Sequence, residues 1–256
     1  MKVSTMSLGM VVIALASGGF IGAVLGFIGA GGAMVSVPIF LYLFDFTPIN
    51  ATTAALAVVF LAAVAGLGPK FKSKDVLVKE AVIIWALGLV TNIGFGLVVT
   101  KIPDQLILLG FSIVLVAAGY SMLKGPITEH PEKSMPIWAL VVLSLLVGTL
   151  TGLFGIGGGF LAIPVLVLFF HTPQNKAAGT SLLIIALNCL TAFFAKSSIW
   201  PEINWRYPAV IALSAVVVSR YASKIAPKSP TVHLRRGFAF LLFVLAAFTI
   251  LVRVVN

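Results

Sequence analysis

The sequence has little charge and few residues suited to catalysis or metal binding. Charged residues make up 9% of its 256 residues, against about a quarter in a soluble protein. Seven residues are acidic and three are histidine, and no carboxylate lies clearly within the middle of an apolar segment. A His-Glu-x-x-His zinc motif is absent, and the single cysteine, Cys189, excludes an internal disulfide. We therefore expect no enzyme, no metal site and no cofactor, and Cys189 is expected to be a small buried residue.

Apolar residues are abundant instead. They make up 60% of the chain, and the mean hydropathy is +1.16. At roughly 20 residues for each full span, the length allows about eight to ten membrane segments. The composition predicts an all-α polytopic protein of the plasma membrane, with the lipid bilayer as its surroundings.

The net charge of +10 comes from basic residues in short loops. In a soluble protein such a charge favours nucleic acid as a partner, but here the positive-inside rule explains it better, and we expect no nucleic-acid partner. An attraction for anions is a second explanation. The exposed faces permit a homodimer without requiring one.

A glycine-rich stretch occurs twice, at residues 26–38 and 152–164. A shift of 126 residues places the glycines at 22, 26, 29, 31 and 32 on those at 148, 152, 155, 157 and 158, and Lys70 on Lys196. A match without gaps over about half the chain indicates two homologous halves. We assign residues 1–123 and 137–256 to them, joined by a hydrophilic linker at 124–136.

Each half contains five predicted segments, and an odd number predicts inverted-topology repeats. If the basic loop at 70–79 is cytoplasmic, alternation also places the linker and the basic loop at 224–236 there, as the positive-inside rule requires. Both termini are then expected on the extracytoplasmic side.

Two apolar segments, about 33–44 and 160–170, are too short to cross a core of about 30 Å. Each follows a glycine cluster, so we expect helices broken inside the membrane, whose free N–H groups face a small anion. Close helix packing is the alternative. The glycines expected at the substrate are Gly29, Gly31, Gly32, Gly155, Gly157, Gly158 and Gly159.

Other polar candidates lie further along each half. Thr53, Thr180 and Ser181 open the long segments that follow the short ones, and we expect them at the substrate. Asn92 and Asn188 lie inside apolar segments, where they line a pathway or form plain interhelical hydrogen bonds.

Charged candidates flank the segments. Lys70 and Lys196 are equivalent in the repeat and would draw an anion to either mouth, or else snorkel as helix ends. His171 ends the second short segment, where it titrates and couples protons or is simply a solvated loop residue.

The fuller copy reads Gly155-Ile156-Gly157-Gly158-Gly159, then Pro164, then Ala178-Gly179-Thr180-Ser181-Leu182. In motif and order it resembles the sulfite exporter TauE/SafE family of membrane permeases, and the resemblance covers both halves. It implies transport of a sulfur oxyanion or organosulfonate such as sulfite or sulfoacetate. In the first half Thr52-Thr53-Ala54-Ala55-Leu56 departs from the pattern, so a symmetric substrate cage is in doubt.

The leading hypothesis is a secondary transporter for a small anion, which works by alternating access around the glycine breaks. A channel-like anion pore, with the breaks as its filter, is one alternative. A non-transporting membrane assembly subunit, in which the glycines serve packing alone, is the other.

Overall fold

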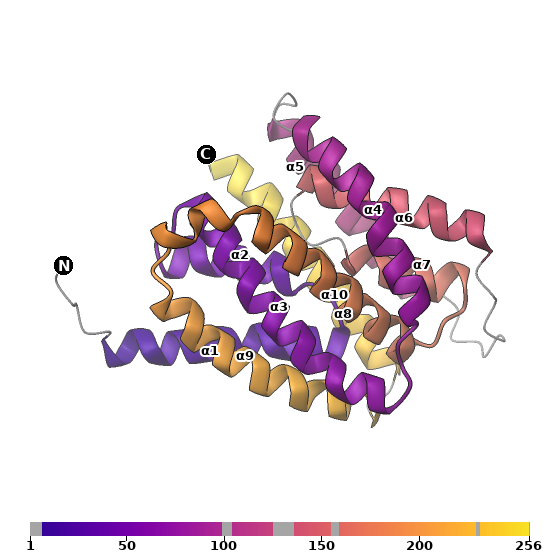
Figure 1. The fold of residues 1–256 in the computed structure, drawn as a ribbon, viewed down its shortest axis with the longest axis horizontal. Coiled ribbons are helices and arrows are strands. Elements are labelled where there is room, and N and C mark those ends of the chain that lie inside the picture. The colour runs from indigo at the N-terminus through magenta and orange to yellow at the C-terminus, as the bar shows by residue number, and fades with distance from the viewer. Residues whose placement is uncertain (1–6, 99–103, 125–135, 155–158, 229–230, 256) are drawn as a thin grey trace.

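The computed structural model describes residues 7–98, 104–124, 136–154, 159–228 and 231–255. The described elements are helices (Figure 1). The α-helices are α1 Leu8–Ile28, α2 Gly32–Leu43, α3 Pro48–Lys72, α4 Val78–Val98, α5 Asp104–Lys124, α6 Ile137–Phe154, α7 Gly159–Phe169, α8 Gln174–Ala195, α9 Arg206–Ile225 and α10 Thr231–Val255. Two short 3-10 helices, η2 Ser197–Glu202 and η3 Ala226–Lys228, flank α9. The all-α class predicted from composition is confirmed.

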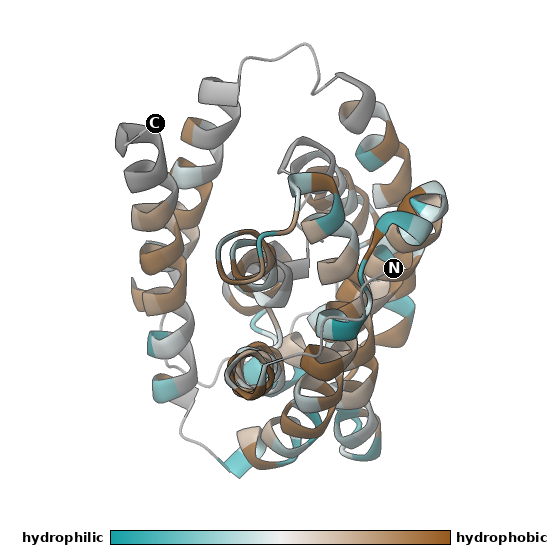
Figure 2. Cartoon of the chain, turned by 90° about the vertical axis from the view of Figure 1, so that its left-hand side faces the viewer, coloured by the Kyte–Doolittle hydropathy of each residue, from teal (hydrophilic) through white to brown (hydrophobic). Residues whose placement is uncertain are grey.

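Five described helices are long and apolar enough to cross a membrane. Their stretches are Leu8–Ile28, Pro48–Lys72, Val78–Phe95, Gln174–Ala195 and Arg206–Lys228. Apolar residues run along the helices, whereas hydrophilic ones lie mostly towards their ends (Figure 2). This distribution suits helices whose sides face lipid and whose ends face water.

The short helices α2 and α7 have 12 and 11 residues, as their sequence predicts. At about 1.5 Å per residue, neither spans a bilayer core of about 30 Å. Each carries its proline, Pro38 or Pro164, inside the helix. The structure thus contains two half-length helices in equivalent positions of the chain.

The same backbone turn follows both short helices. Asp45 and His171, which are 126 residues apart, have positive φ angles of 53° and 52°. The next residue donates its N–H backward in both copies, from Phe46 to Phe40 O at 3.1 Å and from Thr172 to Leu166 O at 3.0 Å. The same local turn therefore recurs 126 residues apart, while the division into two halves and their opposite insertion stay predictions.

The basic loop predicted from residue 70 begins later than expected. Helix α3 continues through Gly68 and Pro69 to Lys72. Ser73 N–H to Pro69 O at 3.1 Å and Asp75 N–H to Lys70 O at 2.9 Å close its last turn. These two bonds satisfy carbonyl groups of the last helical turn. The helix therefore ends after Pro69, and Lys70 is part of it.

Helices α3 and α8 pack on each other. The fourth helix of each predicted half, α4 or α9, packs on helices of the other predicted half. Helix α9 packs on α1 and α3, and α4 packs on α6 and α8. Figure 1 shows α1, α3 and α9 grouped on one side of the molecule and α4 and α6 on the other. Two apolar clusters follow this division, and Cys189 is buried in the one around α3, as expected.

Candidate functional site

The first glycine break is a true interruption of the helix. Gly29 and Gly31 have φ angles of 79° and 83°, a conformation that side-chain-bearing residues rarely adopt. Gly31 is the N-cap of α2, and because glycine has no side chain it cannot itself bond the first N–H groups of that helix. The predicted broken helix is therefore present in the first half.

This break lies against the start of α8. A Cβ on Gly29 would approach the Cα and carbonyl oxygen of Ala178 to 2.6 Å, and a Cβ on Gly32 would come within 2.6 Å of Leu25. Only glycine allows these approaches. Gly155, Gly157 and Gly158 of the second break lie outside the described residues, and Gly159 begins α7.

The glycines of α1 serve a different purpose from those of the break. A Cβ on Gly18, Gly22 or Gly26 would meet backbone atoms of α9 at 2.2 to 2.5 Å. Similarly, a Cβ on Gly148 of α6 would lie 2.2 Å from the carbonyl oxygen of Gly88 of α4. Small residues at such spacing let membrane helices cross closely. Close packing therefore accounts for these glycines, and the positive φ angles set Gly29 and Gly31 apart.

The loop that follows α3 also lies on the start of α8. Thr180 accepts a hydrogen bond from Leu77 N–H at 3.0 Å and donates to Lys176 O at 2.7 Å. A Cβ on Gly179 would approach Asp75 O to 2.0 Å. Because the Gly29 turn contacts Ala178, three neighbouring residues of α8 hold both the helix break and this loop.

Some of the hydroxyl and amide residues predicted at the substrate lie near the start of α8. Thr53, Thr180 and Ser181 are fully buried, and Asn188 is 7% exposed. Thr53 donates to Ile49 O of its own helix at 2.8 Å. The structure thus gathers Thr180 and Ser181 beside the break, whereas their role towards a substrate stays a prediction.

Asn92 lies next to a residue that links α4 to α6, and its own role towards a substrate stays a prediction. It is half-buried, while its neighbour Thr91 donates to Gly88 O and to Leu145 O of α6, each at 3.2 Å. Thr91 is not among the residues predicted from the sequence. The sequence feature that could have identified Thr91 is Gly88, one helical turn earlier, because a small residue there lets the threonine hydroxyl reach a neighbouring helix.

Lys70 points into the protein. Its side chain is fully buried, and Nζ donates to Asn175 Oδ1 of α8 at 3.5 Å. Lys196, the residue after α8, is half-buried and donates to Thr52 Oγ1 of α3 at 3.1 Å. Burial lowers the pKa of the Lys196 ammonium below its ordinary value of 10.5.

These two contacts are reciprocal. The end of α3 reaches the start of α8, and the end of α8 reaches the start of α3, so the two helices are antiparallel. Each lysine meets a neutral amide or hydroxyl, which accepts a hydrogen bond without cancelling the charge. The helix pair therefore carries a lysine at each of its ends, and at the Lys70 end the carboxylate of Asp75 also attracts the ammonium group.

His171 lies half-buried in the turn after α7. His171 follows the C-terminal end of α7 as Asp45 follows that of α2, and both residues have positive φ angles. The break at Gly29 and Gly31 instead precedes the N-terminal end of α2. Within the described residues, no group of three or more His, Cys, Asp or Glu side chains forms a metal-binding set. Proton coupling through His171 stays a prediction.

Comparison with known proteins gives one consistent relationship. The sulfite exporter TauE/SafE family profile matches residues 14–249. A probable membrane transporter protein of Xylella fastidiosa is 31% identical over 189 residues, which cover 70% of this chain and 71% of the relative. One from another strain of that organism is 28% identical over 96% of this chain and 97% of its own, and one from Methanocaldococcus jannaschii is 27% identical over 91% and 93%. No solved structure matches significantly.

Proposed function

Because the chain belongs to the sulfite exporter TauE/SafE family of membrane transporters, we propose that it moves a small sulfur oxyanion or organosulfonate across the plasma membrane by alternating access. The substrate binds near the start of α8, where the first helix break and the loop after α3 meet. The family is described as sulfite exporter TauE/SafE, and the chemistry of this chain suits an anion of that class.

The observation that carries the proposal is the pair of lysines at the two ends of α3 and α8. Lys70 and Lys196 each hydrogen-bond a neutral side chain. Burial of a cation is costly, and a neutral hydrogen-bond acceptor leaves part of that cost for an entering anion to offset. At Lys70 the carboxylate of Asp75 already offsets some of it. One such cation at each end provides an anion with an attractive group on entry and on exit.

The backbone at the break supplies the second kind of donor. The first turn of α2 has glycine as its cap, and the positive φ angles of Gly29 and Gly31 interrupt the chain between α1 and α2. N–H groups at a helix start favour negative charge. An oxyanion with several oxygens accepts from more donors at once than a halide does, because each oxygen carries its own lone pairs.

The contacts on α8 suggest which parts move. The Leu77 N–H to Thr180 bond ties the loop after α3 to α8, and the Lys196 to Thr52 bond ties the opposite ends. Rocking of one half against the other opens one of these contacts while the other holds. The substrate then reaches the break from one side of the membrane at a time.

The test uses purified protein in proteoliposomes, with labelled sulfite on one side and unlabelled sulfite, sulfoacetate, sulfate, acetate or chloride on the other. Alternating access predicts saturable uptake that unlabelled sulfur anions accelerate from the far side. Uptake that rises linearly with concentration and shows no such exchange would indicate a channel-like pore. The absence of uptake for all these anions would overturn the anion assignment.

Lys70→Gln is the decisive variant, because glutamine keeps a polar contact to Asn175 and removes the charge. We expect its transport rate to fall at least tenfold. Lys79→Gln, which removes an exposed lysine from the start of α4, is the matched control and should transport normally. Equal rates for the two variants would contradict a role for Lys70.

A further inference from the structure

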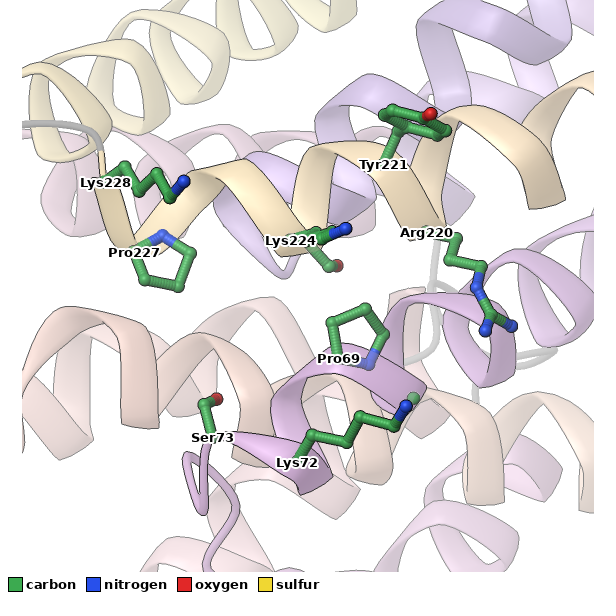
Figure 3. A pocket seen from close by; sticks show the side chains of 10 residues that line it. Pro69, Lys72, Ser73, Arg220, Tyr221, Lys224, Pro227 and Lys228 are labelled. Atoms are coloured by element: carbon green, nitrogen blue, oxygen red, sulfur yellow. The ribbon is translucent and has the colours of Figure 1, made fainter.

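A groove opens between the ends of α3 and α9, separate from the buried contacts of Lys70 and Thr180. Its volume is about 610 Å³, and it is lined by Gly68, Pro69, Lys72, Ser73, Arg220, Tyr221, Ser223, Lys224, Pro227 and Lys228. Figure 3 shows Lys224 and Pro227 of the α9 end across from Pro69 and Ser73 of the α3 end. Both basic loops expected on the cytoplasmic side thus contribute to a single groove.

The charged side chains that line the groove are all basic. One lining residue, Ser73, donates from Oγ to the carboxylate of Asp75 at 2.6 Å. Lys72, Arg220, Lys224 and Lys228 are exposed, and the residues that line it include no carboxylate. Four cations around one concavity repel one another and together create a strong positive potential. A bound anion with more than one charged oxygen offsets that repulsion and accepts several charge-assisted hydrogen bonds.

The approach to the groove along α9 is apolar. Leu213, Val217 and Tyr221 are spaced by four residues and form a stripe on that helix, with exposed fractions of 69%, 59% and 68%. Tyr221 belongs to both the stripe and the groove. On a helix that crosses the membrane, such a stripe faces acyl chains, and a tyrosine marks the level of the headgroups.

We propose that this groove binds the phosphate of an anionic phospholipid, with its acyl chains along the stripe of α9. Basic pockets between membrane helices on the cytoplasmic side are suited to anionic headgroups. A free phosphate would use the four cations equally well but gains nothing from the apolar stripe. The stripe therefore favours the lipid as the source of the phosphate.

The experiment measures thermal unfolding of the detergent-purified protein with added phosphatidylglycerol, phosphatidylcholine, inorganic phosphate or glycerol phosphate, at matched ionic strength. We expect saturable stabilisation by phosphatidylglycerol alone. An equal effect of phosphatidylcholine would overturn the charge requirement. If inorganic phosphate or glycerol phosphate stabilised the protein as much as phosphatidylglycerol, the groove would bind a soluble anion. That result would overturn the proposal that its ligand is a lipid.

Two variants test the groove by independent means. Arg220→Gln combined with Lys224→Gln removes two of its cations, which should weaken the apparent affinity for phosphatidylglycerol roughly 30-fold. Lys74→Gln combined with Lys79→Gln removes the same charge from neighbouring exposed positions outside the groove. If both double variants lost the same affinity for phosphatidylglycerol, the effect would come from general surface charge, and the proposed site would be overturned.

Gly68→Leu fills space instead of removing charge. A Cβ at this position meets nothing within 4 Å, so the variant should fold, and its side chain should narrow the groove that Gly68 lines. Gly237 of α10 also has open space around its Cβ, which makes Gly237→Leu the control. Loss of phosphatidylglycerol binding only in Gly68→Leu supports the proposal, and unchanged binding in both variants overturns it.

Discussion

Gly179 lies so close to Asp75 that a Cβ on the glycine would approach the Asp75 carbonyl oxygen to 2.0 Å. The glycine of the Ala-Gly-Thr-Ser-Leu stretch is therefore required by the loop that crosses it. This contact places Leu77 within hydrogen-bond distance of Thr180 one residue further on. The motif thus positions the loop after α3 on α8.

We expect Gly179→Ala to destabilise the protein, because the added methyl group must displace backbone atoms rather than a flexible side chain. Overpacking of this kind costs about 1–3 kcal/mol. Thermal unfolding in detergent measures the effect. Gly68→Ala, in an open position of α3, is the control and should be neutral or slightly stabilising. A Gly179→Ala protein as stable as this control would show that the loop does not hold its place on α8.

Thr180→Val tests the hydrogen bond that follows this contact. Valine keeps the shape of the side chain but leaves Leu77 N–H without its acceptor, which costs about 1–3 kcal/mol when the group is buried. Thr180→Ser keeps the hydroxyl and should retain most of the stability. If transport falls in Thr180→Val while thermal stability is unchanged, the hydroxyl acts on the substrate rather than on the loop.

The sequence predicted the elements that depend on local pattern. The 126-residue shift, the two short helices and the interruption at Gly29 and Gly31 all follow from composition and spacing, because glycine clusters and segment length act locally.

The contacts between distant segments were not predictable in the same way. The sequence predicted a basic loop from residue 70, yet α3 continues to Lys72 and carries Lys70 inward. Asn175 and Thr52 become partners of the lysines only because α3 and α8 pack antiparallel. Such pairings depend on tertiary packing, which no local pattern specifies.

The crossing of α1 and α9 gives a prediction about packing alone. Gly22→Val should disrupt this crossing, since a Cβ on Gly22 would lie 2.5 Å from Ala215 O. Gly19→Val, three residues earlier, places its Cβ in ordinary contact with Ser214 at 3.5 Å and should be tolerated. The yield of monodisperse protein after purification separates the two. Similar yields would contradict the close approach of these helices.

The reduced pKa of Lys196 predicts how transport depends on pH. The ammonium is charged below its pKa and neutral above it, and burial lowers that pKa from 10.5. Charge is therefore lost at a lower pH than for a solvated lysine, and the attraction for an anion is lost with it. We expect the uptake rate to fall on the alkaline side, starting below pH 10.5.

Lys196→Arg separates this effect from general alkaline inactivation. Arginine stays protonated throughout the accessible range, so the alkaline fall should move to higher pH while uptake at neutral pH is largely retained. Lys196→Met should transport slowly at every pH and show no such fall. If wild type and Lys196→Arg give superimposable profiles, the titrating group is not Lys196, and the contact between Lys196 and Thr52 has only a structural role.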